Sequence, residues 1–166
     1  MAIDLYLIRH GLAGKYGSYQ NDELRPLTEE GIQKTRQVAD RLHTIGLHFD
    51  RLLTSPLVRA RQTAEILQQA GVGKTLEESR LLAPEGTLRD WEPWFEQWKL
   101  LGEMGLALVG HEPNLSTWAE QMVWGTSRQH LEMKKAGVIG LHVPESGSVV
   151  GTSELYWLTP PRFLLK

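Results

Sequence analysis

Short apolar segments alternate with helical patterns along this chain, and this alternation limits its possible folds more than any other feature. Residues 3–9 and 106–110 are predicted to form buried strands. Shorter strands are predicted around 51–54 and near Leu76. Strands that alternate with helices are typical of an α/β sandwich with a largely parallel sheet. Two further strands, "GVIGLHVP" and "SELYWLT", follow one another near the C-terminus and would add an antiparallel edge.

Helix boundaries are marked by capping residues between these strands. Thr28 is a suitable N-cap for a helix that ends at Gly46. Ser55 is expected to cap the next helix, with Pro56 in its first turn. A later helix is predicted over "PNLSTWAEQMV".

An apolar stripe runs through residues 88–101, and Pro93 marks a helix start or a kink within it. Aromatic residues at helical spacing usually belong to a core, so we expect this stripe to be core, with a partner-binding surface as the alternative. Its members are Leu88, Trp91, Trp94, Phe95, Trp98 and Leu101.

The overall composition excludes several kinds of protein and site. The 166 residues fit one domain spanning 1–166, and a net charge of −2 gives no general reason to bind nucleic acid or an anionic membrane. The absence of cysteine excludes disulfides, thiolate metal sites and cysteine nucleophiles. The N-terminus lacks the basic region of a signal peptide, and no apolar run approaches the length of about 18 residues that spans a bilayer. We therefore expect a soluble cytoplasmic protein.

Side chains that can carry positive charge follow three of the predicted strands. Arg9 and His10 end the first strand, Arg59 follows the second, and His111 comes after the strand at 106–110. Ligands of such sheets bind beyond the carboxyl ends of the strands, so we expect these groups at one edge. A cation in the first turn of a helix, as at Arg59, is unfavourable unless an anion is bound there. Any one of these residues alone is usually a solvated or hydrogen-bonding group. The prediction of a phosphate site therefore rests on the four residues together.

Three segments resemble the histidine phosphatase superfamily, also called phosphoglycerate mutase-like. "LIRHG", "TSPLVRARQTAE" and "LVGHEPNL" look like its R-H-G, S-x-x-x-R-A-x-x-T and G-H motifs, in the family's order. The short chain, "RPLTEEG" and "LYWLTPPRFLL" are similar to the SixA-type phosphohistidine phosphatases. The resemblance implies a three-layer α/β/α fold and His10 as nucleophile. It further implies phosphoryl binding by Arg9, Arg59 and His111, with Arg25 as an accessory ligand.

Two carboxyl groups are candidates for the general acid. Many superfamily members use a glutamate from a region that corresponds to Glu85 in "LLAPEG". SixA-type proteins lack the usual glutamate, and their candidate aspartate corresponds to Asp22 in "YQNDELRPLT". No metal or other cofactor is expected, because the arginines can supply the positive charge that the phosphoryl group requires.

The predicted function is hydrolysis of phosphohistidine on a signalling or phosphotransfer domain, through a phosphorylated His10. Phosphohistidine is favoured because its imidazole leaving group needs little help from an acid. One alternative is a small-molecule phosphomonoesterase or a phosphoglycerate-mutase-like enzyme. Another is a phosphate-binding protein without turnover. The predicted partners are a histidine-phosphorylated domain and phosphate, and the protein is expected to act as a monomer.

Overall fold

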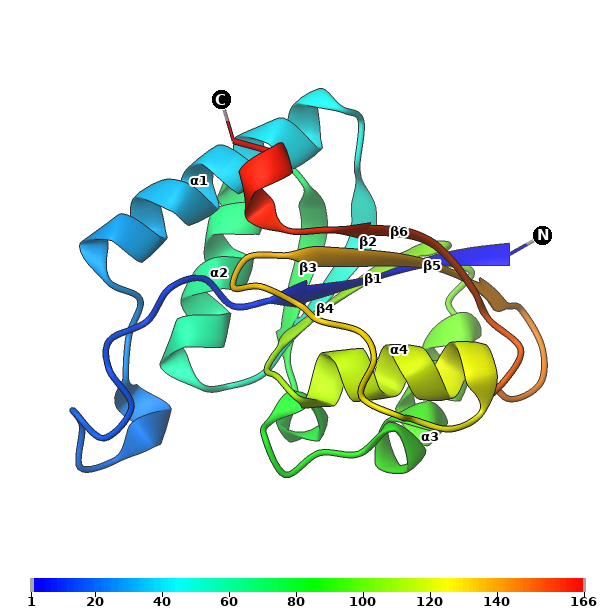
Figure 1. The fold of residues 1–166 in the computed structure, drawn as a ribbon. Helices are drawn as coiled ribbons and strands as arrows, with labels where there is room; N and C mark the ends of the chain where they lie inside the picture. The colour runs from blue at the N-terminus through cyan, green and yellow to red at the C-terminus, as the bar shows by residue number, and fades with distance from the viewer. Residues whose placement is uncertain (1, 166) are drawn as a thin grey trace.

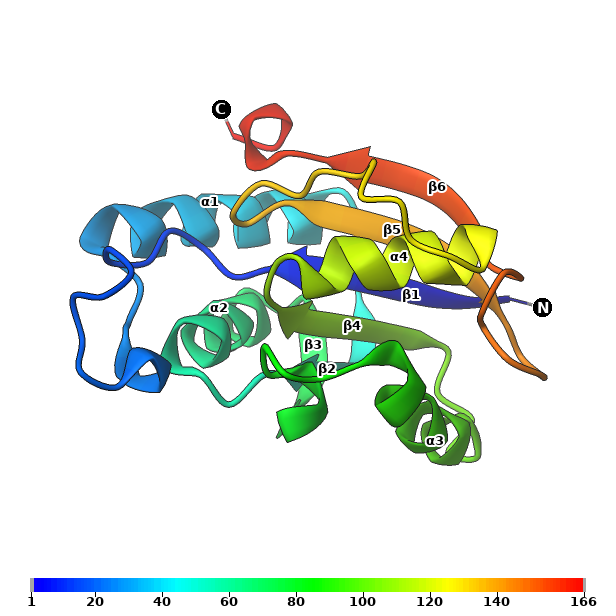
Figure 2. The same ribbon diagram turned by 60° about the horizontal axis from the view of Figure 1, so that its bottom comes forward.

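The computed structural model describes residues 2–165, in which the strands form one sheet between two layers of helices. The strands pair in the order β3-β2-β4-β1-β5-β6 (Figure 2). β1 and β2 are each parallel to β4, and β3 is parallel to β2. β5 is antiparallel to both β1 and β6, so the predicted antiparallel edge is confirmed. The strands are β1 (Ala2–Arg9), β2 (Phe49–Thr54), β3 (Gly73–Glu78), β4 (Gly105–Gly110), β5 (Val138–Pro144) and β6 (Glu154–Thr159).

The helices cover both faces of the sheet, which confirms the three-layer α/β/α fold (Figure 1). Successive side chains of a strand point to opposite faces, and β1 follows this rule. Leu5 and Leu7 pack toward α3 (Leu88–Lys99) and α4 (Asn114–Trp124). Tyr6 and Ile8 pack toward α1 (Glu29–Thr44) and α2 (Val58–Gln69).

The predicted cap of α1 is confirmed, but the predicted cap of α2 is wrong. The Thr28 hydroxyl accepts a hydrogen bond from the Gly31 amide, as an N-cap does. α2 begins at Val58, three positions after Ser55, and its N-cap residue is Leu57. The Ser55 hydroxyl oxygen accepts a hydrogen bond from the Leu57 amide before the helix starts. The hydroxyl hydrogen is not used in this bond and can be donated to another group.

The aromatic stripe is largely core, although it ends earlier than predicted. Trp91 and Trp98 are buried in the cluster between the sheet and the helices α3 and α4. Pro93 lies inside α3 instead of at its start. The helix ends at Lys99, so Leu101 lies beyond it and is 61% exposed.

Short 3-10 helices extend the loops beyond the sheet. η1 (Asp22–Leu24) and η2 (Arg80–Leu82) are joined by an ion pair of Arg80 with Glu23 at 2.8 Å. η3 (Pro161–Phe163) follows β6. Within residues 2–165, every helix is too short or too polar to cross a membrane.

Candidate active site

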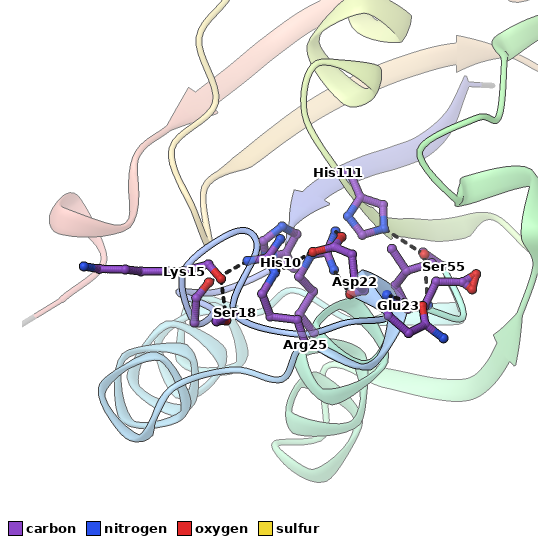
Figure 3. A network of polar contacts seen from close by, with 12 residues as sticks. His10, Lys15, Ser18, Asp22, Glu23, Arg25, Ser55 and His111 are labelled. Atoms are coloured by element: carbon purple, nitrogen blue, oxygen red, sulfur yellow. Dashed lines mark hydrogen bonds and ion pairs between the residues drawn. The ribbon is translucent and has the colours of Figure 1, made fainter.

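Three neighbouring strands deliver side chains to one edge of the sheet. His10 follows β1, Ser55 follows β2 and His111 follows β4. β4 holds the other two chains in place, since the His10 amide donates to the Gly110 carbonyl at 3.1 Å and the Ser55 amide to Val109 at 3.0 Å. The rings of His10 and His111 lie with their centroids 5.3 Å apart (Figure 3). The fold therefore brings the residues after β1, β2 and β4 together at the carboxyl ends of these strands, as predicted.

The His10 ring is oriented with one nitrogen bound and the other available. Nδ1 lies 2.7 Å from the carbonyl oxygen of Gly11. A carbonyl only accepts, so Nδ1 carries the hydrogen and Nε2 of the neutral ring keeps its lone pair. Burial lowers the pKa of His10 to about 3, and the charges of Arg59 and Arg9 act in the same direction. At neutral pH the ring is uncharged, as a nitrogen nucleophile must be.

The backbone that carries His10 is packed against α1 and α2. The Gly11 amide donates to the Thr63 hydroxyl at 3.0 Å, and that hydroxyl donates to the Arg59 carbonyl at 2.9 Å. A Cβ at Gly11 would lie 2.3 Å from Thr35 Oγ1, so only glycine allows this close approach. Thr63 therefore links the backbone next to His10 to the helix that carries Arg59.

Guanidinium groups supply the positive charge of the site. Arg59 is 5% exposed, and burial lowers its pKa, with Arg25 adding to the effect. Arg9 donates through Nη1 to the Met133 carbonyl at 2.9 Å. Nε of Arg9 and Nε of Arg59 are buried without a hydrogen-bond partner among residues 2–165. These arginines are thus drawn out of water without full compensation, which favours binding of an anion.

Asp22 is held between two of the predicted phosphate ligands. Its carboxylate lies 2.8 Å from Arg25 Nε (Figure 3). The same carboxylate lies 3.1 Å from Arg59 Nη2. Its backbone carbonyl also accepts from Arg59 at 3.0 Å. The hydrogen bond from Arg25 is the main cause that lowers the pKa of Asp22, and Arg59 adds to it. At neutral pH this group is a carboxylate and accepts hydrogen bonds.

Glu85 lies on the rim and is bound to another residue. Its carboxylate pairs with Arg80 at 3.0 Å, and its side chain is 64% exposed. A hydrogen bond from its own backbone amide and the contact with Arg80 lower its pKa. Glu85 is therefore also ionised at neutral pH.

Ser55 holds the second histidine. Its hydroxyl lies 2.8 Å from Nε2 of His111, while it also accepts from the Leu57 amide. The hydroxyl hydrogen can therefore be donated to Nε2, which leaves the ring hydrogen on Nδ1. Nδ1 is buried without a hydrogen-bond partner among residues 2–165. Burial lowers the pKa of His111 to about 4, and Arg59 contributes, so the ring is neutral.

The structure gathers most of the predicted site residues and adds two more. The contacts above link five of them: His10, His111, Arg59, Arg25 and Asp22. Arg9 lies close enough to affect the pKa values of both histidines. Glu85 lies at the rim of the site. Ser55 and Thr63 are the first and last positions of the S-x-x-x-R-A-x-x-T motif, but the sequence suggested only a capping role for Ser55 and no role for Thr63. Their spacing from Arg59, four residues on either side, was visible in "SPLVRARQT", but a spacing does not show what each hydroxyl contacts.

Comparison with known proteins gives one family and one fold. The model of the family described as the histidine phosphatase superfamily (branch 1) matches residues 5–99, a range that includes His10 and Arg59. An uncharacterized protein of Picosynechococcus sp. is 45% identical over 98% of this chain and 99% of its own. The structure of the protein histidine phosphatase SixA complexed with tungstate has the same fold, with a TM-score of 0.85 over 98% of this chain and 99% of that one, at 22% identity.

A relative of known name aligns over a shorter range. The adenosylcobalamin/alpha-ribazole phosphatase of Salmonella typhimurium is 45% identical over 67 residues. The match covers 38% of this chain and 31% of that enzyme.

Proposed function

Because this chain belongs to the histidine phosphatase superfamily, we propose that it is a phosphohistidine phosphatase that acts on a protein through a phosphorylated His10. One observation carries the proposal: the histidine that would attack is neutral and free at Nε2, whereas both candidate acids are ionised and ion-paired. We further propose that the protein acts as a monomer in the cytoplasm, with a signalling or phosphotransfer domain as its substrate.

In the first step, His10 Nε2 attacks phosphorus. A bond forms between Nε2 and phosphorus, the bond from phosphorus to the substrate's imidazole nitrogen breaks, and its electron pair returns to that imidazole. Arg9 and Arg59, with Arg25 beside them, stabilise the charge on the phosphoryl oxygens during transfer. His111 donates from Nδ1 to one of these oxygens. The guanidinium groups supply the counter-charge, so no step requires a metal ion.

In the second step, water attacks the phosphorus of phosphorylated His10. The bond to Nε2 breaks and the ring recovers its lone pair, while Nδ1 keeps its hydrogen bond to the Gly11 carbonyl throughout. The proton of the water passes to phosphate and then to solvent. The product is inorganic phosphate.

The leaving group decides how much acid catalysis the site must provide. An alkoxide is a poor leaving group and needs a proton donor close to the bond that breaks. The imidazole of phosphohistidine can take a proton on its other ring nitrogen before the bond to phosphorus breaks, and it then leaves as a neutral molecule. Asp22 and Glu85, both with lowered pKa values, suit the second kind of leaving group.

The partial relative from Salmonella typhimurium supports a second candidate, a small-molecule phosphomonoesterase. That reading requires a protonated carboxyl at the leaving oxygen, for which Glu85 is the alternative to Asp22. A phosphate-binding protein without turnover has less support, because His10 stands among Arg9, Arg59 and His111 with its Nε2 free.

The test is dephosphorylation of a histidine-phosphorylated phosphotransfer domain by the wild type and by His10→Ala. An aryl phosphate and a sugar phosphate serve as parallel substrates. We expect rapid loss of phosphate from the protein, slower loss from the aryl ester, and loss below detection from the sugar ester. His10→Ala should be inactive on all three.

Faster turnover of the sugar phosphate than of the protein would replace this proposal by the phosphomonoesterase and make Glu85→Gln the next variant. Phosphate binding by the wild type without turnover of any substrate would favour the binding protein.

A further inference from the structure

A hollow of about 330 Å³ opens beside the reaction site, between the start of α1, the segment before β5 and the segment that begins η3. Most of its wall is apolar and includes Leu12, Ala136 and Pro161. The charged residues that line it are all cations: Arg9, Lys34, Lys134 and Lys135.

The hollow is continuous with the catalytic residues. Arg9 lines it and belongs to the phosphoryl site. The Ala136 amide donates to the carbonyls of both Arg9 and His10, each at 3.1 Å. Lys135, the residue before Ala136, is therefore fixed next to the backbone of the nucleophile. A protein that presents a phosphorylated histidine to His10 would bring its neighbouring side chains over this hollow.

Positive charge in the hollow is only partly balanced by the protein itself. Lys34 pairs with Glu30 at 3.0 Å and Lys134 with Glu132 at 2.8 Å, both on the exposed rim. Lys135 makes no ion pair with the residues at 2–165. Partial burial lowers the pKa of Lys135, and the charges of Arg9 and Arg25 act in the same direction.

Polar groups buried around the hollow also lack partners. Thr35 lines it with 1% of its surface exposed, and its Oγ1 is without a hydrogen-bond partner among residues 2–165. Nε of Arg9 is in the same condition. These two atoms lie behind the wall, so it is the excess positive charge of the lining lysines and Arg9 that suits the hollow to an anionic group.

We propose that this hollow binds an aspartate or glutamate side chain that flanks the phosphohistidine of the substrate protein, with Lys135 as its main partner. The inference rests on the proposed function and names the kind of protein surface that the enzyme selects. A carboxylate side chain fits because its methylene groups can lie on Leu12 and Ala136 while its oxygens reach the amine of Lys135.

The test compares two substrates with the same leaving group. One is a histidine-phosphorylated phosphotransfer domain with a glutamate beside its phosphohistidine, and the other is phosphoimidazole, which has no carboxylate. For Lys135→Gln we expect the ratio of kcat/KM for the protein to kcat/KM for phosphoimidazole to fall about tenfold, mainly through KM for the protein. Lys135→Arg should restore most of the ratio.

Two controls isolate the contact. Lys74→Gln removes the same charge from an exposed position near the start of β3, at the opposite end of the sheet, and should leave the ratio unchanged. Changing the flanking glutamate of the substrate to glutamine should lower the ratio for the wild type but not lower it further for Lys135→Gln.

Three results would overturn the inference. An unchanged ratio in Lys135→Gln would show that the hollow does not bind the protein. An equal loss on both substrates would place Lys135 on the phosphoryl group itself. A wild type that turns over neither substrate but does hydrolyse alkyl phosphates would overturn the proposed function, and this inference with it.

Discussion

Individual hydrogen bonds decide which nitrogen of each histidine faces the substrate. The Gly11 carbonyl leaves His10 with a lone pair on Nε2, and the Ser55 hydroxyl can donate to Nε2 of His111, which would keep the hydrogen of that ring on Nδ1. The two rings therefore present opposite chemistry to the phosphoryl group: a lone pair from one and a donor from the other. Both are neutral at pH 7, because burial lowers their pKa values to about 3 and about 4.

Ser55→Ala should lower kcat about tenfold on phosphoimidazole and the free energy of unfolding by about 1 to 3 kcal/mol, because the buried Leu57 amide also loses its acceptor. The His111 ring would lose the contact that fixes its hydrogen on Nδ1, and with it a donor to the transition state. The ¹⁵N chemical shifts of the ring should show the second tautomer. Ser153→Ala is the matched control, since Ser153 is also buried but bonds to the Val149 carbonyl. Unaltered shifts together with full activity would contradict this role for Ser55.

At this scale the sequence located the charged residues of the site but not their partners. Arg9, His10, Arg59 and His111 stand at strand ends or first helical turns, where simple rules of topology bring them together. Ser55 was misassigned because a serine before a proline and a helix is an ordinary N-cap pattern. Its contact with His111 depends on the register between β2 and β4, residues 56 positions apart, which local patterns do not encode.

Among the secondary structure elements, α1 packs so closely on the loop after His10 that no added side-chain atom is tolerated at Gly31. The Thr28 amide donates to the Leu12 carbonyl at 3.0 Å, just where the helix begins. A Cβ at Gly31 would lie 2.0 Å from that same oxygen. Backbone meets backbone here, so neither side can yield by changing a rotamer. The first turn of α1 thereby fixes the segment that follows His10.

Gly31→Ala should destabilise the protein by about 2 to 4 kcal/mol and reduce activity on every substrate, because Leu12 must move and His10 with it. Urea unfolding and kcat/KM for phosphoimidazole are the measurements. Gly14→Ala offers a control in the same loop, since a Cβ there would meet its nearest atoms at 3.7 Å. Equal stability of the two variants would mean that α1 is not held against this loop as tightly as the contact indicates.

The order and type of the elements followed from the sequence more fully than their ends did. The strands at 3–9 and 106–110 and the helix capped by Thr28 were recovered because period and cap agree. α3 ends at Lys99 although the apolar pattern continues to Leu101, which shows that hydrophobicity alone does not extend a helix. Its Pro93 is tolerated in the interior although proline usually breaks a helix there.

For the whole molecule, two neutral histidines buried at the edge of the sheet make stability depend on pH. In the unfolded chain each histidine has a pKa of 6.5, against about 3 and about 4 in the fold. Between pH 6.5 and 4 the unfolded chain therefore binds more protons, and the free energy of unfolding falls as the pH is lowered. The stabilisation is fully present above pH 6.5.

We expect each of the two histidines to account for about 1 to 2 kcal/mol of lost stability between pH 7 and pH 5. His111→Gln should remove about half of this dependence in urea titrations, whereas His48→Gln, at an exposed site, should keep all of it. A wild type whose unfolding free energy is flat from pH 7 to 5 would contradict the neutral, buried state of the rings.

The two arginines that contact Asp22, Arg25 and Arg59, form an anion site that we call the arginine cradle, and this site is already occupied by a carboxylate of the chain. Asp22 occupies Arg25 and Arg59 with an anion that the chain itself supplies. Asp22→Asn should therefore tighten the binding of inorganic phosphate about tenfold, measured by calorimetry, because the amide competes weakly for guanidinium groups. Weaker phosphate binding by this variant would mean that Asp22 assists the ligand.

Asp22 can thus be viewed as a tethered competitor, whose effective concentration at the two arginines is set by the short loop that carries it. The affinity measured for a free oxyanion then reflects the difference between the binding free energies of that oxyanion and of the Asp22 carboxylate. It is therefore lower than the intrinsic affinity of the two arginines for an anion. We expect the same competition to favour turnover, because the Asp22 carboxylate can take the place of product phosphate at the guanidinium groups. A site that must bind a phosphoryl group tightly in the transition state can in this way release phosphate quickly afterwards.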